Sequence, residues 1–66
     1  QLLGLEVREN GLRLGEISDI LSHPAHDLYV LRRDSGGETL IPALKSVVRS
    51  VDTRAGYMEV ELPEGL

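Results

Sequence analysis

Residues 7–14 read VRENGLRL, and the pair Asn10-Gly11 lies at the centre of this stretch. A two-residue type I′ turn needs positive φ at both central positions, which Asn-Gly supplies, so the stretch predicts a β-hairpin. The flanking residues support this, because apolar and polar side chains alternate with the period of a strand. The residues expected on the apolar face are Leu3, Leu5 and Val7 before the turn, and Leu12 and Leu14 after it.

Beyond the hairpin the alternation breaks at Gly15, and the next apolar residues are Ile17, Ile20 and Leu21. That spacing fits one face of a helical turn, and it also fits a strand with a bulge or bend at the glycine. No helix cap and no helix-length apolar pattern accompany it. We therefore expect a bent strand, with glycine where a barrel strand turns a corner.

Four more strands are expected downstream, each bounded by turn residues. They cover residues 27–33, 38–41, 47–51 and 57–62, and ALKS (residues 43–46) is expected to form a single tight turn. Six short strands without a convincing helix indicate a small all-β barrel or sandwich. We favour a six-stranded antiparallel barrel with one short helical turn, because closure removes exposed strand edges.

The composition narrows the possible partners. The 66 residues form one domain at most, and no apolar run approaches the ~20 residues that cross a bilayer. There is no cysteine, and the net charge is −4 at pH 7. The seven Lys and Arg residues are scattered and there are only two tyrosines, which argues against direct binding of nucleic acid. An acidic domain suits a basic protein partner, although the same charge could serve solubility alone.

The segment SHPAHD (residues 22–27) is the most conspicuous polar cluster. His23, His26 and Asp27 are too few and too constrained by Pro24 for a metal site. We expect a turn in which Asp27 accepts hydrogen bonds from backbone amides. No serine lies in a nucleophile elbow, and no phosphate-binding loop is present. The sequence therefore predicts no enzyme, no metal and no cofactor.

The strand at 28–31 is apolar on both faces, with Leu28 and Val30 on one side and Tyr29 and Leu31 on the other. One face then belongs to the core. The other face either forms an exposed patch for a protein partner or is buried by curling of the sheet. The residues leave these two possibilities open.

Four segments, taken in order, resemble the C-terminal PRC-barrel domain of the ribosome maturation factor RimM family. They are LGEISDIL (14–21), HDLYVL (26–31), LIPA (40–43) and MEVELPEGL (58–66). The resemblance runs nearly end to end and implies a six-stranded β-barrel over residues 1–66. It also implies that the chain is roughly the C-terminal half of a two-domain protein, whose N-terminal barrel and the preceding linker tyrosines are absent. Relatives tend to have T-G-A-N-D where this chain has HPAHD, so His26 is expected to adopt positive φ as asparagine does.

The function implied by the resemblance is non-enzymatic assembly of the small ribosomal subunit in the cytoplasm. The family is associated with small-subunit ribosomal protein nineteen of the head domain, with the 30S precursor and with rRNA processing. A monomer is expected. The candidate partner-binding residues are Asp27, Leu28, Tyr29, Pro42, Leu62, Pro63 and Leu66. The alternatives are a self-associating PRC-barrel protein, and direct rRNA contact through Arg32, Arg33, Arg49 and Arg54.

Overall fold

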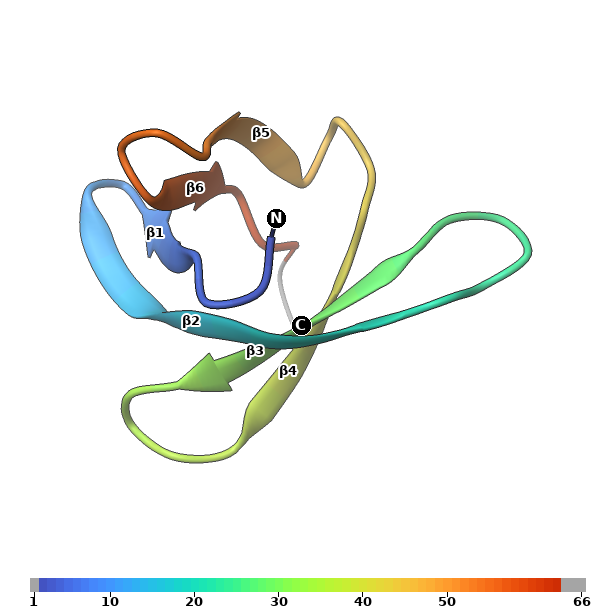
Figure 1. Ribbon diagram of the computed structural model, residues 1–66, viewed down its shortest axis with the longest axis horizontal. Coiled ribbons are helices and arrows are strands. Elements are labelled where there is room, and N and C mark those ends of the chain that lie inside the picture. The colour runs from blue at the N-terminus through green and yellow to red at the C-terminus, as the bar shows by residue number, and fades with distance from the viewer. Residues whose placement is uncertain (1, 64–66) are drawn as a thin grey trace.

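The computed structural model describes residues 2–63, and these residues form six β-strands (Figure 1). The strands are β1 (Glu6–Glu9), β2 (Leu12–Leu21), β3 (Leu28–Arg33), β4 (Glu38–Pro42), β5 (Val48–Asp52) and β6 (Tyr57–Val60). The expected all-β class with six strands is confirmed. Within residues 2–63 there is no helix that is long and apolar enough to span a membrane.

The β1–β2 hairpin forms as expected, with φ of 52° at Asn10 and 78° at Gly11. The expected apolar face is wrong at two positions. Leu12 pairs with Glu9 at the tip of the hairpin and is 71% exposed, because no other strand packs over the tip. Leu3 precedes β1 and is also exposed. Leu14, by contrast, packs against the core.

Strand β2 is continuous through Gly15, which confirms the bent strand. A Cβ atom on Gly15 would lie 2.0 Å from the carbonyl oxygen of Arg32 on β3, so only glycine permits this approach of the two backbones. Further along, Ile17 pairs with Leu31 and Asp19 pairs with Val30, which leaves Ser18 as the extra residue of a β-bulge. The extra residue shifts the alternation by one position for the rest of the strand.

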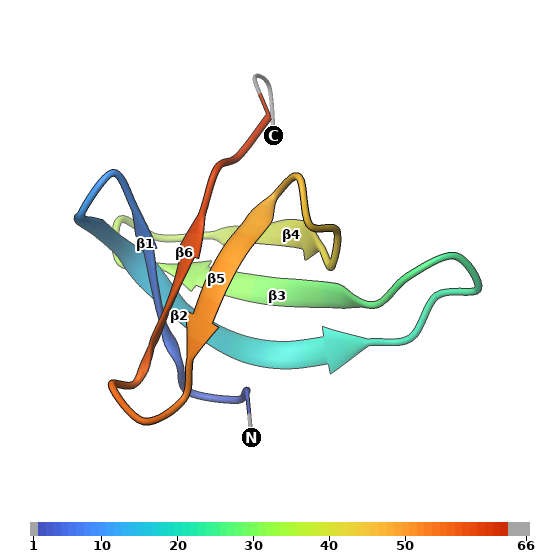
Figure 2. The same ribbon diagram turned by 90° about the horizontal axis from the view of Figure 1, so that it is seen from above.

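The strands hydrogen-bond in the order β4-β3-β2-β1-β6-β5 and form a curled half-barrel. Figure 2 shows β1, β6 and β5 running across β3 and β4, while β2 curves from the first group into the second. In two respects the pairing differs from a closed antiparallel barrel. Strands β1 and β6 are parallel, and β4 and β5 are the two edges of the sheet.

The connection from β4 to β5 contains the single tight turn that was expected. The carbonyl oxygen of Leu44 accepts hydrogen bonds from the N–H groups of Val47 at 2.9 Å and Val48 at 2.7 Å. This is the bonding of one helical turn, and the chain then enters β5 directly. The expected strand at 47–51 is thus confirmed to within one residue.

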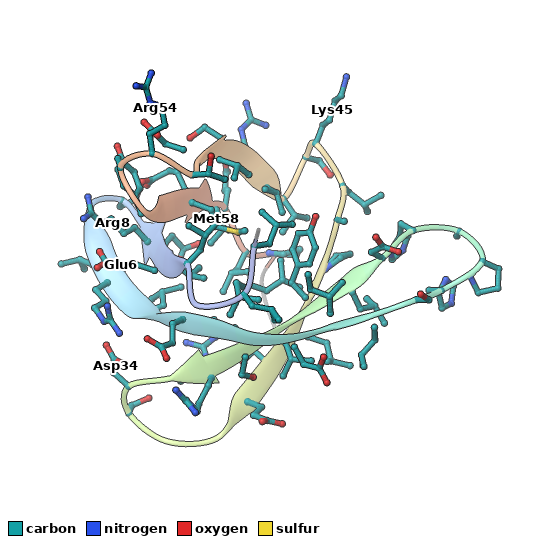
Figure 3. The ribbon with its side chains drawn as sticks, viewed as in Figure 1. Glu6, Arg8, Asp34, Lys45, Arg54 and Met58 are labelled. Carbon is teal, nitrogen blue, oxygen red and sulfur yellow. The ribbon has the colours of Figure 1, made fainter. Side chains whose placement is uncertain are left out.

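The core lies inside the curl of the sheet, between the two groups of crossing strands. Its centre is formed by fully buried side chains, and Met58 lies in the middle of Figure 3. No polar side chain in the described part of the chain is buried. The buried hydrophobic residues are Leu5, Val7, Ile17, Val30, Leu31, Ile41, Val47, Met58 and Val60.

We expect Gly15→Ala to destabilise the domain by about 3 kcal/mol or more, because the methyl group would clash with backbone that cannot move freely. That loss would unfold much of the population of a domain this small. Gly56→Ala is the control, since Gly56 has φ of 88° but open space around it and should lose only about 1–2 kcal/mol. Urea unfolding followed by circular dichroism measures both. Equal losses in the two variants would contradict the role of the close approach.

Candidate functional site

The expected partner-binding residues do not share one surface. Leu28 of β3 and Pro42 of β4 pair directly and lie on the outer face of the sheet. Tyr29 pairs with Ile41 on the opposite, inner face and packs against the core. The structure therefore keeps Leu28 and Pro42 together and turns Tyr29 away from them.

The remaining candidates lie elsewhere. Leu62, after β6, packs against the core and its N–H donates to Oε2 of Glu9 at 2.7 Å. Pro63 follows it and is exposed. Leu66 lies outside the described residues. Asp27 directly precedes Leu28, and its carbonyl oxygen accepts a hydrogen bond from the N–H of Ala43 at 2.9 Å.

Leu28 and Pro42 belong to a larger apolar surface on the outer face of β2, β3 and β4. Cross-strand pairing places Leu21 opposite Leu28, and places Val30 opposite Leu40. Leu21 and Leu40 are 40% and 46% exposed, and Val30 is buried although it lies outside the core cluster. We call this surface the outer strip, and it consists of Leu21, Leu28, Val30, Leu40 and Pro42.

Leu21 and Leu40 were not among the expected contacts, and for Leu21 the reason is the bulge at Ser18. A strict alternation from Ile17 would have placed Leu21 inside. The extra residue instead directs Ile20 toward the core and Leu21 outward. For Leu40 a signal was available, since it alternates with the buried Ile41 in a strand that begins after a clear turn.

Residues 22–27 form the loop that joins β2 to β3, and this loop projects from the body of the domain (Figures 1 and 2). The rings of His23 and His26 stack with centroids 5.2 Å apart. Nδ1 of His23 accepts a hydrogen bond from the N–H of Ala25 at 3.1 Å. The turn-forming side chain is therefore His23, and the expected role of the Asp27 side chain is wrong.

The expected positive φ at His26 is also wrong. In the described range, Asn10 is the one residue other than glycine with positive φ. The loop between β2 and β3 closes without a residue in the left-handed region, because the His23 side chain and Pro24 shape it. Residues 2–63 contain no group of three or more side chains placed to hold a metal ion, and no pocket opens among them.

A network of ion pairs lies beside the β1–β2 hairpin. Nε of Arg13 is 2.7 Å from Oδ2 of Asp34, and Nη1 of Arg13 is 3.0 Å from Oε1 of Glu6. Arg8 also pairs with Glu6, and its guanidinium lies 4.0 Å from the centre of the Tyr57 ring. Figure 3 shows Glu6 and Arg8 at this hairpin with Asp34 on the same side. The network neutralises charge here and ties β1 and β2 to the β3–β4 turn.

The four arginines considered for RNA contact are separated by their partners. Nη2 of Arg32 is 2.6 Å from Oε1 of Glu16, and Nε of Arg33 donates to Oγ1 of Thr39 at 2.7 Å. In the described part of the chain no ion pair is found for Arg49 or Arg54. Lys45 and Arg54 project from the side of the domain that carries β5 (Figure 3).

Carboxylates without an ion pair border the outer strip. Asp19 pairs with Val30 across the strands, and Glu38 pairs with Arg32, whose guanidinium already forms an ion pair with Glu16. No ion pair within residues 2–63 involves these two carboxylates. The outer strip is therefore an apolar surface with an acidic border.

The ion pairs predict a specific effect of acid on stability. Hydrogen bonding lowers the pKa of Glu6, chiefly through Arg8 and secondarily through Arg13, and Arg13 lowers the pKa of Asp34. Both carboxylates therefore stabilise the folded state at pH values above their ordinary pKa values of 4.5 and 3.8. This stabilisation is lost as the pH falls through their lowered pKa values in the folded state.

Arg13→Gln should raise the pKa of Asp34 to near its ordinary value and that of Glu6 only partly, since Arg8 remains. NMR titration of the side-chain carboxyl carbons measures both. Arg54→Gln removes the same charge where no ion pair is found in the described residues, and should leave both pKa values nearly unchanged. Identical titrations in Arg13→Gln and the unaltered chain would contradict the network.

Comparison with known proteins places this geometry in a family. The model of the RimM PRC barrel domain matches residues 1–66. Proteins named ribosome maturation factor RimM are similar over the whole chain or nearly so. The relative from Heliobacterium modesticaldum is 57% identical over 68 residues, which cover 100% of this chain and 40% of that protein. The relative from Geotalea daltonii is 54% identical, covering 98% of this chain and 38% of that protein.

A solved structure agrees with the sequence relatives. The crystal structure of a 16S ribosomal RNA processing protein RimM from Pseudomonas aeruginosa superposes with a TM-score of 0.85 at 33% identity. The match covers 98% of this chain and 43% of that one. This chain spans about two-fifths of the length of these relatives. The half-barrel, its six strands and its sequence identify the chain as a member of the RimM PRC barrel domain family.

Proposed function

We propose that this domain is a non-enzymatic protein-binding module of a ribosome maturation factor. It acts as the C-terminal domain of a two-domain protein, in the cytoplasm, where small subunits are assembled. Its partner is small-subunit ribosomal protein nineteen in the head of the 30S precursor, and binding assists 30S assembly and rRNA processing. The observation that carries this proposal is the match of the family model to residues 1–66.

The chemistry of the surface supports a protein partner. The domain has eleven carboxylates against seven Lys and Arg residues, and its unpaired acids border an apolar surface. Such a surface complements a partner that combines basic side chains with an apolar centre. The relatives' name, ribosome maturation factor, supports a ribosomal protein as that partner.

The candidate contacts divide by position. Leu28 and Pro42 on the outer face and Asp27 next to Leu28 are proposed contacts, and Pro63 is a further proposed contact that is exposed. Tyr29 and Leu62 contribute from within, by supporting the strands that carry the contacts. Leu66 remains a proposed contact outside the described residues.

Titration of this domain with purified small-subunit protein nineteen tests the proposal. We expect saturable one-to-one binding in isothermal titration calorimetry, because the acidic, apolar face complements a basic protein. Hen lysozyme, also a basic protein, is the control for non-specific attraction and should produce no saturable heat. If a complete relative binds protein nineteen and this domain does not, recognition lies outside the domain and the proposal is wrong.

The two alternatives have their own signatures. Self-association would appear in light scattering as a mass above that of the monomer at tens of micromolar. Contact with rRNA would weaken steeply and log-linearly with salt, because it releases counterions. We expect a monomer and no such salt-dependent binding to RNA.

A further inference from the structure

We propose that the outer strip of β2, β3 and β4, and not the inner-face residues or the β5 side, is the docking surface for a cationic protein. This inference rests on the proposed function and deepens it. It assigns the contact to Leu21, Leu28, Leu40 and Pro42, and assigns the charge recognition to Asp19 and Glu38.

The first argument is continuity. Leu21, Leu28 and Pro42 form one row across three strands, because each pairs with its neighbour. Val30 and Leu40 form the next row, and Leu28 and Val30 lie two residues apart on the same face. Directly paired side chains in a sheet lie about 5 Å apart at Cβ, so the two rows form one apolar surface.

The second argument is that Leu21 and Leu40 of the strip remain exposed and do not help to form the core. The strip lies on the outer face of the sheet. Ile20, Tyr29 and Ile41 lie on the opposite face and point into the core. Leu21 and Leu40 remain 40% and 46% exposed after folding. A continuous apolar surface that the monomer leaves uncovered marks an interaction site more often than scattered exposed residues do.

Two other exposed apolar side chains, Leu12 and Val51, lie apart from this surface. Leu12 lies at the tip of the β1–β2 hairpin and pairs with Glu9. Val51 lies on β5 between Ser50 and Asp52, and its partner Met58 points into the core. These two residues are therefore suitable controls for apolar exposure without continuity.

The third argument is the sign of the charge at the border. Asp19 and Glu38 form no ion pair within residues 2–63. The guanidinium groups of Arg32 and Arg13 both pair with Glu16, and Arg13 pairs in addition with Glu6 and Asp34. The border is therefore acidic. A basic protein lowers its electrostatic energy here, whereas the phosphates of a nucleic acid are repelled. The charge thus selects one class of partner for the strip.

The test compares two pairs of substitutions by calorimetry with purified small-subunit head proteins, protein nineteen among them. Leu21→Ser with Leu40→Ser should weaken binding of the protein that binds the unaltered domain by about tenfold or more, because buried apolar contacts carry most of the affinity. Leu12→Ser with Val51→Ser removes apolar side chains that are exposed elsewhere and should change affinity by less than about twofold. Thermal unfolding of each variant verifies that it is folded at the temperature of the assay.

NMR with the unaltered, ¹⁵N-labelled domain supplies a readout that needs no variant. On addition of the bound protein, backbone amides of residues 19–21, 28–30 and 40–42 should shift most. Shifts concentrated on β5 and β6, or equal affinity in the two pairs of variants, would overturn the inference while leaving the proposed function intact. Binding of a head protein other than nineteen through these amides would overturn the proposed partner alone. If no head protein binds, both proposals are wrong.

The acidic border has a separate kinetic signature. Asp19→Asn with Glu38→Gln should slow association about two- to fivefold at low salt and reduce its dependence on salt, because charges at a rim act mainly on the association rate. Glu59→Gln with Glu61→Gln changes the net charge equally on the β6 side. Stopped-flow measurements that give the same association rate for the two pairs would contradict the charge assignment.

Discussion

The close contact between Gly15 of β2 and the carbonyl of Arg32 on β3 is the constraint on which the shape of this domain depends. Strand β2 is the element that pairs with β1 in one group of strands and with β3 in the other. Glycine at the crossover lets the two backbones approach to a distance that any side chain would prevent. The strand can therefore turn between the groups without a break, and six short strands enclose a core that a flat sheet of this size could not bury.

The bulge at Ser18 has a consequence beyond the local backbone. It reverses the alternation after Ile17, so that Ile20 joins the core and Leu21 faces outward. Without the extra residue, Asp19 would face the core, where a carboxylate is costly to bury. The bulge thus keeps the core apolar and at the same time completes the outer strip. One inserted residue connects the stability of the domain to the surface that we propose for recognition.

The order of the charged residues in the sequence suggests that they are scattered. In the folded domain they are grouped. Around the β1–β2 hairpin they cancel in a network centred on Arg13. Each of these exposed ion pairs contributes little to stability alone. The network removes cations from the surface that β2 and β3 share, and the carboxylates beside the outer strip remain unbalanced. The acidic character of the whole chain is thereby concentrated where an apolar surface is available.

Local signals determined much of the fold. Asn10-Gly11 specified the first hairpin, Gly15 specified the bend, and the alternation around Met58 specified the last strand. These features depend on backbone preferences of neighbouring residues, which the sequence states directly. The resemblance of four ordered segments was sufficient for the family, and the net charge of −4 indicated the sign of the partner.

Only the tertiary structure decided which side chains share a surface. The order of the strands, the parallel pairing of β1 with β6 and the position of Ser18 as an extra residue depend on contacts between distant segments. The alternation in β3 separates Leu28 from Tyr29 but does not determine which of them faces the core, and it does not reveal that Leu40 pairs with Val30. A surface is a property of register, and register is settled by packing across strands rather than by the residues of one strand alone.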